Sequence, residues 1–185
     1  MSYQIVESQK SDEELVQSVL AGETDDYAPI VSRYQGHVAN LCFKLCGDRL
    51  PVDEVVQQVF VELYVSLPRF RFQSKLSTFI YRITVNVVSK MLSKNKRNLP
   101  PDETYMASLP SGDLNVEQSI VKEERSRQLH EAIGKLKHEQ RTALVLYTFN
   151  DFSYQDIADV MQVSMAKVES LIFRAKKNLA KMLRP

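Results

Sequence analysis

The sequence predicts an all-α protein made of two helical modules that a Pro-rich linker joins. Apolar residues recur with a period near 3.6 residues over most of the 185-residue chain, which is the spacing of one helix face. Residues that start and stop helices fall between these periodic runs. Residues 97–115 lose the period and contain three of the seven prolines, as expected of a linker.

Four helices are expected before the linker. Ser11 and Glu14 have the spacing of a capping box at the start of a short apolar run. Longer apolar periods follow through residues 25–46 and 51–67, and Pro at the next position stops the second of them. A fourth period runs through residues 74–95. Each of these runs is typical of an amphipathic helix.

Helical periods resume after the linker. They cover, in order, residues 115–136, 138–149, 153–161 and 165–183. A strand interpretation is weak, because the β-branched run at 55–65 lies inside a helical period. We therefore place the first module at residues 11–96, the linker at 97–115 and the second module at 116–185.

Residues 153–176 have the organisation of a helix-turn-helix motif. Ser153 and Ser164 each stand at an N-cap position before an apolar helical period, and residues 161–164 are the whole connection. A short helix, a tight turn and a longer helix together place the start of the second helix in a DNA major groove. The motif therefore predicts DNA binding.

Local charge supports this interpretation, although the whole chain has a formal net charge of only +1. Residues 165–185 contain six Lys and Arg residues against one acid. A solvated face of a terminal helix would explain this charge alone. The helix-turn-helix pattern directly upstream favours phosphate contact instead. The candidate DNA contacts here are Ser164, Met165, Ala166, Lys167, Glu169, Ser170, Phe173, Arg174 and Lys177.

Two of these residues have alternative interpretations. Glu169 can accept a hydrogen bond from a cytosine amino group, or it can pair with a surface cation such as Lys176. Phe173 can press on a thymine methyl group, or it can lie at the rim of the core beside Ile172.

Several classes of protein are excluded. The five glycines include no Gly-x-Gly spacing, which removes the dinucleotide-binding fingerprint and the P-loop. The chain has no Ser/His/Asp constellation and no metal-ligand spacing, so we expect no enzyme, no cofactor and no metal.

Cys42 and Cys46 lie one helical turn apart among apolar residues and are expected to be small buried hydrophobes. The sequence shows no apolar signal core and no apolar run of about 20 residues, so a cytoplasmic protein is expected.

The motifs resemble those of a known family. Residues 136–179 are similar to domain four of bacterial RNA polymerase sigma factors of the extracytoplasmic-function (ECF) type, with the helix-turn-helix SYQDIADVMQVSMAKVESLIFRAKKNL. Three earlier blocks resemble sigma domain two, in the same order as in the family. They read DEELVQSVLAGETDDYAPIVSRY, VDEVVQQVFVELYVSLPRFRF and KLSTFIYRITVNVVSKMLSKNKR. The chain departs from the family at Glu169 and Leu171, where basic residues are common.

The resemblance implies a protein that binds core RNA polymerase and directs it to promoters. Domain four would read the minus-35 element with the contacts named above. The second block would bind the clamp of the largest polymerase subunit, and the flap would also be contacted. Its implied polymerase contacts are Asp53, Glu54, Gln57, Gln58 and Phe60. The third block would read and open the minus-10 element.

The physics of the third block agrees with that role, because residues 69–97 interleave rings with cations. Rings stack on exposed bases and cations follow the phosphates of single-stranded DNA. Core burial is the alternative for Phe79 and Ile83. The implied minus-10 contacts are Phe70, Phe72, Lys75, Tyr81, Arg82, Asn86, Lys90 and Lys94.

Two other functions are compatible with parts of the pattern. A stand-alone helix-turn-helix regulator would bind an operator tightly without polymerase, usually as a dimer. A helical adaptor would bind proteins without any dependence on DNA. The family resemblance further implies an anti-sigma factor as a partner, which in this family is frequently membrane-bound.

Overall fold

The computed structural model describes residues 10–98, 127–149 and 152–183, and these residues form helices and connecting turns without a strand. The all-α prediction is confirmed. The N-terminal module consists of α1 (Asp12–Leu20), α2 (Tyr27–Cys46), α3 (Val52–Ser66) and α4 (Leu76–Asn98), with 3-10 turns at Thr24–Asp26, Gly47–Arg49 and Leu67–Arg69. The C-terminal module contains helical residues 127–135 followed by α6 (His138–Phe149), α7 (Tyr154–Met161) and α8 (Met165–Met182). Most of the predicted linker, from residue 99 on, lies outside the described residues.

The N-terminal helices begin and end where the sequence chemistry requires. The Ser11 side chain accepts a hydrogen bond from the backbone N–H of Glu14, and the Glu14 carboxylate accepts one from the backbone N–H of Ser11 at 2.7 Å. The predicted capping box is therefore confirmed. Gly22 follows α1 with φ +108°, and Gly47 follows α2 with φ +53°. Both values lie in the left-handed region, where glycine carries no steric penalty.

The core of the N-terminal module lies between α2, α3 and α4. The fully buried side chains include Ile30, Val38, Leu45, Val55, Val59, Leu63, Ile80 and Val88. Cys42 and Cys46 are also fully buried, which confirms the prediction that they are small core hydrophobes. Burial raises the pKa of each thiol to about 12. Both are therefore protonated at neutral pH and unreactive as nucleophiles.

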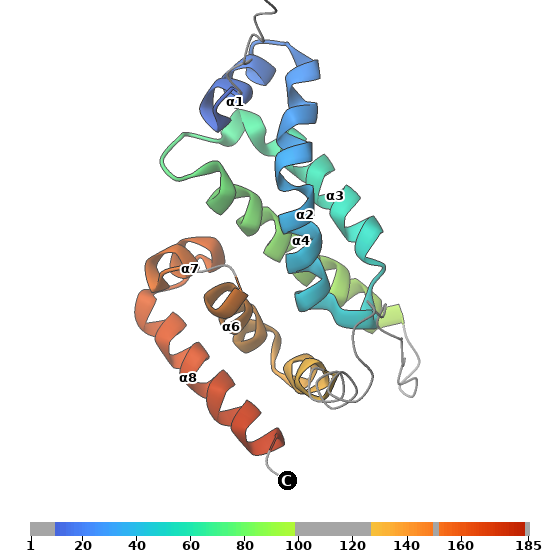
Figure 1. The fold of residues 1–185 in the computed structure, drawn as a ribbon, viewed down its shortest axis with the longest axis vertical. Coiled ribbons are helices and arrows are strands. Elements are labelled where there is room, and N and C mark those ends of the chain that lie inside the picture. Colours follow the sequence, from blue (N-terminus) through green and yellow to red (C-terminus); the bar gives the residue numbers. More distant parts are fainter. Residues whose placement is uncertain (1–9, 99–126, 150–151, 184–185) are drawn as a thin grey trace, which may run out of the picture.

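The C-terminal module packs along one side of the N-terminal bundle (Figure 1), and one hydrophobic cluster runs through both modules. The α7 helix lies against α4, and α6 lies against α2. The Tyr81 and Phe152 rings meet edge to face with centroids 5.1 Å apart. The Lys44 ammonium lies 4.7 Å from the centroid of the Phe149 ring. The sequence predicted two modules but not this interface.

The turn between α7 and α8 depends on one residue in a left-handed conformation. Gln162 has φ +55° and ψ +46°, and its neighbour Val163 donates a backbone hydrogen bond to Ala158 O at 3.1 Å. A side chain in this region costs about 1–2 kcal/mol. The sharp reversal nevertheless brings α8 into contact with α7.

We expect Gln162→Gly to raise the free energy of unfolding by about 0.5 kcal/mol, because relief of the left-handed strain exceeds the added chain entropy of glycine. The matched control is Gln155→Gly, an exposed position inside α7, where glycine should lower the free energy of unfolding by about 1 kcal/mol. Urea unfolding followed by circular dichroism measures both. Destabilisation at both positions would contradict the assigned strain.

Candidate nucleic-acid interface

The α8 helix separates a buried seam from an exposed surface. Ser164 caps it, since its hydroxyl accepts a hydrogen bond from the backbone N–H of Lys167 at 3.3 Å. The seam that packs into the module consists of Val168, Leu171, Ile172 and Ala175. The first turns on the other side are therefore free to face a partner.

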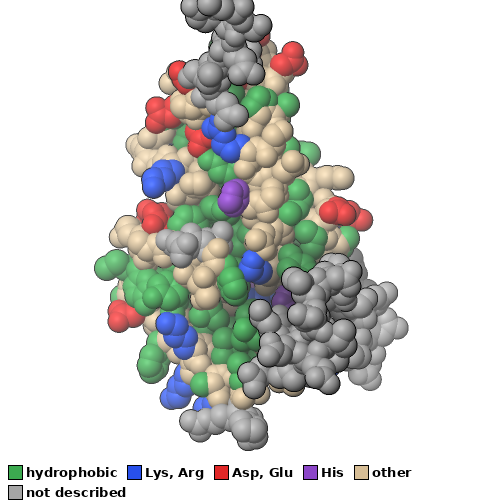
Figure 2. Space-filling model, viewed as in Figure 1, with side chains coloured by type: hydrophobic (Ala, Val, Ile, Leu, Met, Phe, Trp, Pro, Cys, Tyr) green, Lys and Arg blue, Asp and Glu red, His purple; other side chains and the backbone are tan. Residues whose placement is uncertain are grey.

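Most of the predicted contacts on α8 lie on its exposed side. The exposed residues are Ser164, Met165, Ala166, Lys167, Glu169, Phe173, Arg174 and Lys177, while Ser170 is partly buried. Phe173 is 66% exposed and its neighbour Ile172 only 2%. The interpretation of Phe173 as a rim residue of the core is therefore wrong. Figure 2 shows blue cationic side chains over the part of the surface where Figure 1 places α8.

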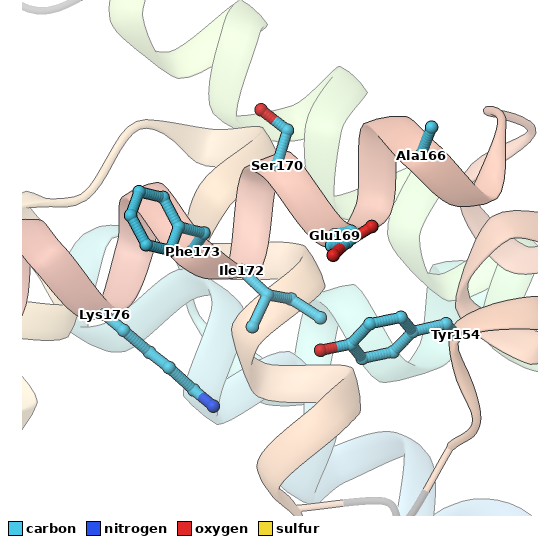
Figure 3. A pocket seen from close by; sticks show the side chains of 7 residues that line it. All are labelled: Tyr154, Ala166, Glu169, Ser170, Ile172, Phe173 and Lys176. Atoms are coloured by element: carbon cyan, nitrogen blue, oxygen red, sulfur yellow. The ribbon is translucent and has the colours of Figure 1, made fainter.

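A shallow hollow of about 410 Å³ lies beside the first turns of α8 (Figure 3). Its lining residues are Tyr154, Ala166, Glu169, Ser170, Ile172, Phe173 and Lys176. The Lys176 ammonium lies 4.9 Å from the centroid of the Tyr147 ring, and that ring meets Tyr154 at 5.5 Å. The hollow therefore combines aromatic rings, a carboxylate and a cation.

Tyr154 is a residue of this surface that the sequence analysis missed. It is the first residue of α7, directly after the capping Ser153, and its ring reaches across to α8 (Figure 3). No local signal in the sequence indicated this role, because the place of Tyr154 beside α8 depends on the turn between the two helices. Lys167 has a further contact, an ion pair with Glu139 of α6 at 2.8 Å.

The α3 helix presents a polar face beside an exposed apolar one. The predicted polymerase contacts Asp53, Glu54, Gln57 and Gln58 are all exposed. Phe60 is only 8% exposed and belongs to the core. Its side chain therefore supports the helix and does not meet a partner in this structure, which corrects its assignment as a contact.

Three exposed apolar residues near the end of α3 were missed by the sequence analysis. They are Val61, Tyr64 and Val65, with exposed fractions of 57%, 44% and 64%. Their positions in the sequence indicated this exposure, because they fall outside the helical stripe that carries the buried Val59 and Leu63. A groove of about 510 Å³ lies between α3 and α4. The polar side chains of that groove are Glu54, Gln58, Glu62, Lys90, Lys94 and Asn95.

The predicted minus-10 segment divides into exposed and covered residues. Phe72, Lys75, Asn86, Lys90 and Lys94 are exposed. Phe72 is 37% exposed and has φ +56°, an uncommon conformation for an aromatic residue that turns the loop before α4. This loop therefore presents an aromatic ring just before α4, three residues from the exposed Lys75.

Two minus-10 candidates are buried in this arrangement, and a third is engaged by the C-terminal module. Phe70 is 8% exposed and packs between Phe72 and Phe79, with centroids 4.8 and 4.9 Å away. Tyr81 is 7% exposed because Phe152 covers its ring. Arg82 donates a hydrogen bond from Nε to the carbonyl of Asp159 at 3.2 Å. Side-chain access therefore corrects the assignment of Phe70, and the C-terminal module covers the other two.

Comparisons with known proteins decide the family. The model of Sigma-70 region 2 matches residues 30–98, and that of Sigma-70 region 4 matches residues 126–179. The RNA polymerase sigma-H factor of Pseudomonas aeruginosa is 32% identical over 187 residues, with 96% of each chain covered. The ECF RNA polymerase sigma-E factor of Haemophilus influenzae is 30% identical, with 96% of this chain and 97% of the relative covered. This chain belongs to the sigma-70 family, ECF type.

Membership in this family defines the function in general terms. A sigma factor binds core RNA polymerase and directs it to specific promoters for transcription initiation. Sigma factors are non-catalytic regulators of transcription. The stand-alone regulator is not favoured, because the family matches extend over both modules.

Two solved structures share the fold. The CnrH chain in the structure of CnrH with the cytosolic domain of CnrY has a TM-score of 0.67 at 21% identity, with 94% of this chain and 97% of CnrH covered. The sigma factor RpoE of Bartonella quintana, solved with the anti-sigma factor NepR, has a TM-score of 0.65 at 18% identity, with 85% and 96% covered. Among the described residues of this sigma factor, no helix is long and apolar enough to span a membrane.

The corrected position of Phe60 gives a stability prediction for this sigma factor. Phe60→Ala should lower the free energy of unfolding by about 3 kcal/mol, because it leaves a cavity in the core. Its exposed neighbour is the matched control, and Val61→Ala should change the free energy of unfolding by less than about 0.5 kcal/mol. Chemical denaturation of the full chain measures both. Equal effects would show that Phe60 is not a core residue.

Proposed function

We propose that α8 reads the minus-35 element, that α4 and the loop before it read and open the minus-10 element, and that α3 anchors the chain on core polymerase. The observation that carries this proposal is the exposed side of α8. A buried seam holds the helix in place while Phe173, Arg174 and Lys177 remain exposed. A helix so presented fits the major groove of duplex DNA.

The minus-35 contacts divide into base-reading and phosphate-binding residues. Arg174 lies one position after the exposed Phe173 and can reach base edges, whereas Lys177 lies almost one turn further from the helix start and can bind phosphate. Glu169 can accept a hydrogen bond from a cytosine amino group, and the Phe173 ring can press on a thymine methyl group. The carboxylate lies in the hollow beside Tyr154, which limits the bases that fit there.

The minus-10 contacts suit melted DNA. The exposed Phe72 ring can stack on an unpaired base, and Lys75, Lys90 and Lys94 can bind the phosphates of the strand. Asn86 is exposed on α4, and its amide can make paired contacts with adenine. In this proposal Tyr81 and Arg82 join the site when the C-terminal module moves away.

The polar side of α3 is the proposed anchor on the clamp of the largest polymerase subunit. Asp53, Glu54, Gln57 and Gln58 are exposed together there, and amide and carboxylate groups suit a basic partner surface. The C-terminal module would contact the flap. The protein acts in the cytoplasm, where the polymerase works, and has no catalytic chemistry of its own.

An anti-sigma factor is the proposed regulatory partner, and a membrane-bound protein of this kind fits the family pattern. Support comes from two sigma factors of the same fold, one solved with the cytosolic domain of CnrY and the other with the anti-sigma factor NepR.

Two substitutions on α8 test the division between base and phosphate contacts. Lys177→Ala should weaken holoenzyme binding to all promoter sequences equally and reduce the salt slope of log K by about 0.9. Arg174→Ala should change the preference at one position of the minus-35 element by about 1–3 kcal/mol. The measurement is a titration of holoenzyme against a set of duplexes with single base changes, at several salt concentrations. If both variants shift every sequence equally, the assigned reading side is wrong.

The polymerase anchor is tested by the double variant Asp53→Lys/Gln57→Lys. Both side chains are exposed four residues apart, so the core is unchanged and the helical spectrum should persist. Like charges opposite a basic partner cost several kcal/mol, which should abolish capture of core polymerase in a pull-down. The matched control is Glu13→Lys/Gln17→Lys, an exposed pair of the same spacing on α1, which should bind normally. Undiminished capture of the first variant would remove α3 from the interface.

A further inference from the structure

The interface between the modules covers part of the proposed minus-10 site. Phe152 covers the Tyr81 ring, and the carbonyl of Asp159 holds the Arg82 guanidinium. Phe152 lies two residues before α7, and Asp159 lies within that helix. In this closed arrangement the Tyr81 ring is buried, and the Nε of the partly exposed Arg82 is engaged by the C-terminal module.

A histidine lies in the same interface. His138, the first residue of α6, is half-buried, and its Nε2 lies 2.5 Å from the Ser89 hydroxyl oxygen on α4. The Ser89 hydroxyl donates its hydrogen to the carbonyl of Val85 at 2.8 Å. The serine oxygen must therefore accept a hydrogen bond from Nε2–H of His138. The neutral imidazole therefore carries its hydrogen on Nε2, and its Nδ1 carries no hydrogen.

The surroundings of Nδ1 oppose a second proton. Nδ1 is buried and has no hydrogen-bond partner among the described residues, so an added N–H would lack an acceptor there. The Arg49 cation is held near the end of α2, where its Nε donates to Cys46 O at 3.0 Å and its Nη2 to Leu45 O at 3.3 Å. Within the part of the chain that the structure describes, the groups that act on the ring are the uncharged Ser89 on α4, the cation Arg49 after α2, and Glu139 on its own helix.

We propose that neutral His138 latches the C-terminal module onto α4, and that protonation of its imidazole releases the latch and uncovers Tyr81 and Arg82. The latch itself follows from the interface. Only the statement that its release uncovers a DNA-binding surface rests on the proposed function of α4.

The direction of the pH dependence follows from the surroundings of the ring. Burial first and Arg49 second lower the pKa of His138 in the closed arrangement, and Glu139 opposes them. The ordinary pKa of an exposed histidine is about 6.5. The closed arrangement therefore has its full stability above about pH 6.5 and loses stability as the pH falls below that value. Uptake of one proton changes the ratio of open to closed molecules by at most about tenfold per pH unit.

The test is energy transfer between two dyes on the full chain. The dyes are attached to Gln17→Cys on α1 and Ala180→Cys on α8, two exposed positions outside the proposed binding surfaces. The native Cys42 and Cys46 are buried with a pKa of about 12 and do not compete for the dyes. Transfer should fall between about pH 8 and about pH 5.5, on either side of the ordinary histidine pKa. The helical circular dichroism signal should stay unchanged.

Variants connect the response to His138. His138→Gln retains an N–H donor for Ser89 but does not titrate, so its transfer should stay high at both pH values. Ser89→Ala removes the acceptor and should lower transfer already at the higher pH. The matched control is His37→Gln, an exposed position on α2 that should respond like the parent chain. A parent chain without a pH response, a His138→Gln variant that opens like the parent, or a loss of helical signal during opening would each overturn the latch.

A second measurement separates the latch from the function of α4. Binding of a fluorescent single-stranded minus-10 oligonucleotide to the parent chain should strengthen at the lower pH, while His138→Gln should lose most of that gain. Opening in the energy-transfer measurement without any gain in DNA binding would support the latch and overturn the assignment of Tyr81 and Arg82 to DNA.

Discussion

The position of α4 between two modules is the constraint on which the rest of the structure depends. Consecutive residues on a helix are rotated by about 100°, so neighbours can serve different surfaces. Ile80 and Val88 are fully buried, and the residues that directly follow them, Tyr81 and Ser89, meet the C-terminal module. One helix therefore completes the core of the N-terminal bundle and also receives α6 and α7. A change in the rotation of α4 would disturb both modules together.

The sequence was sufficient to predict those features that depend on residues close together in the chain. The capping serines and the 3.6-residue periods predicted the helices, because hydrogen bonds within three residues and burial of one face determine them. Phe60 shows the limit of the same method. The family resemblance implied a polymerase contact at this position, but its 8% exposure makes it a core residue.

The rest could not be predicted, because it depends on contacts between distant parts of the chain. The pair formed by His138 and Ser89 joins residues 49 positions apart. Neither residue is unusual for its helix, so no local pattern indicates that they meet. Tyr154 is similar, since its place beside α8 depends on the left-handed turn at Gln162. The exposure of the candidate residues on α8 was predictable, because a strong apolar seam leaves the opposite side of the helix to solvent.

The buried cysteines of α2 bear on how oxidative stress could reach this transcription system. Both thiols are fully buried and protonated at neutral pH, so peroxide and thiol-modifying compounds find no thiolate to attack in the folded chain. Oxidation of these two thiols therefore requires the core around α2 to open first, so its rate reports how often the N-terminal bundle opens.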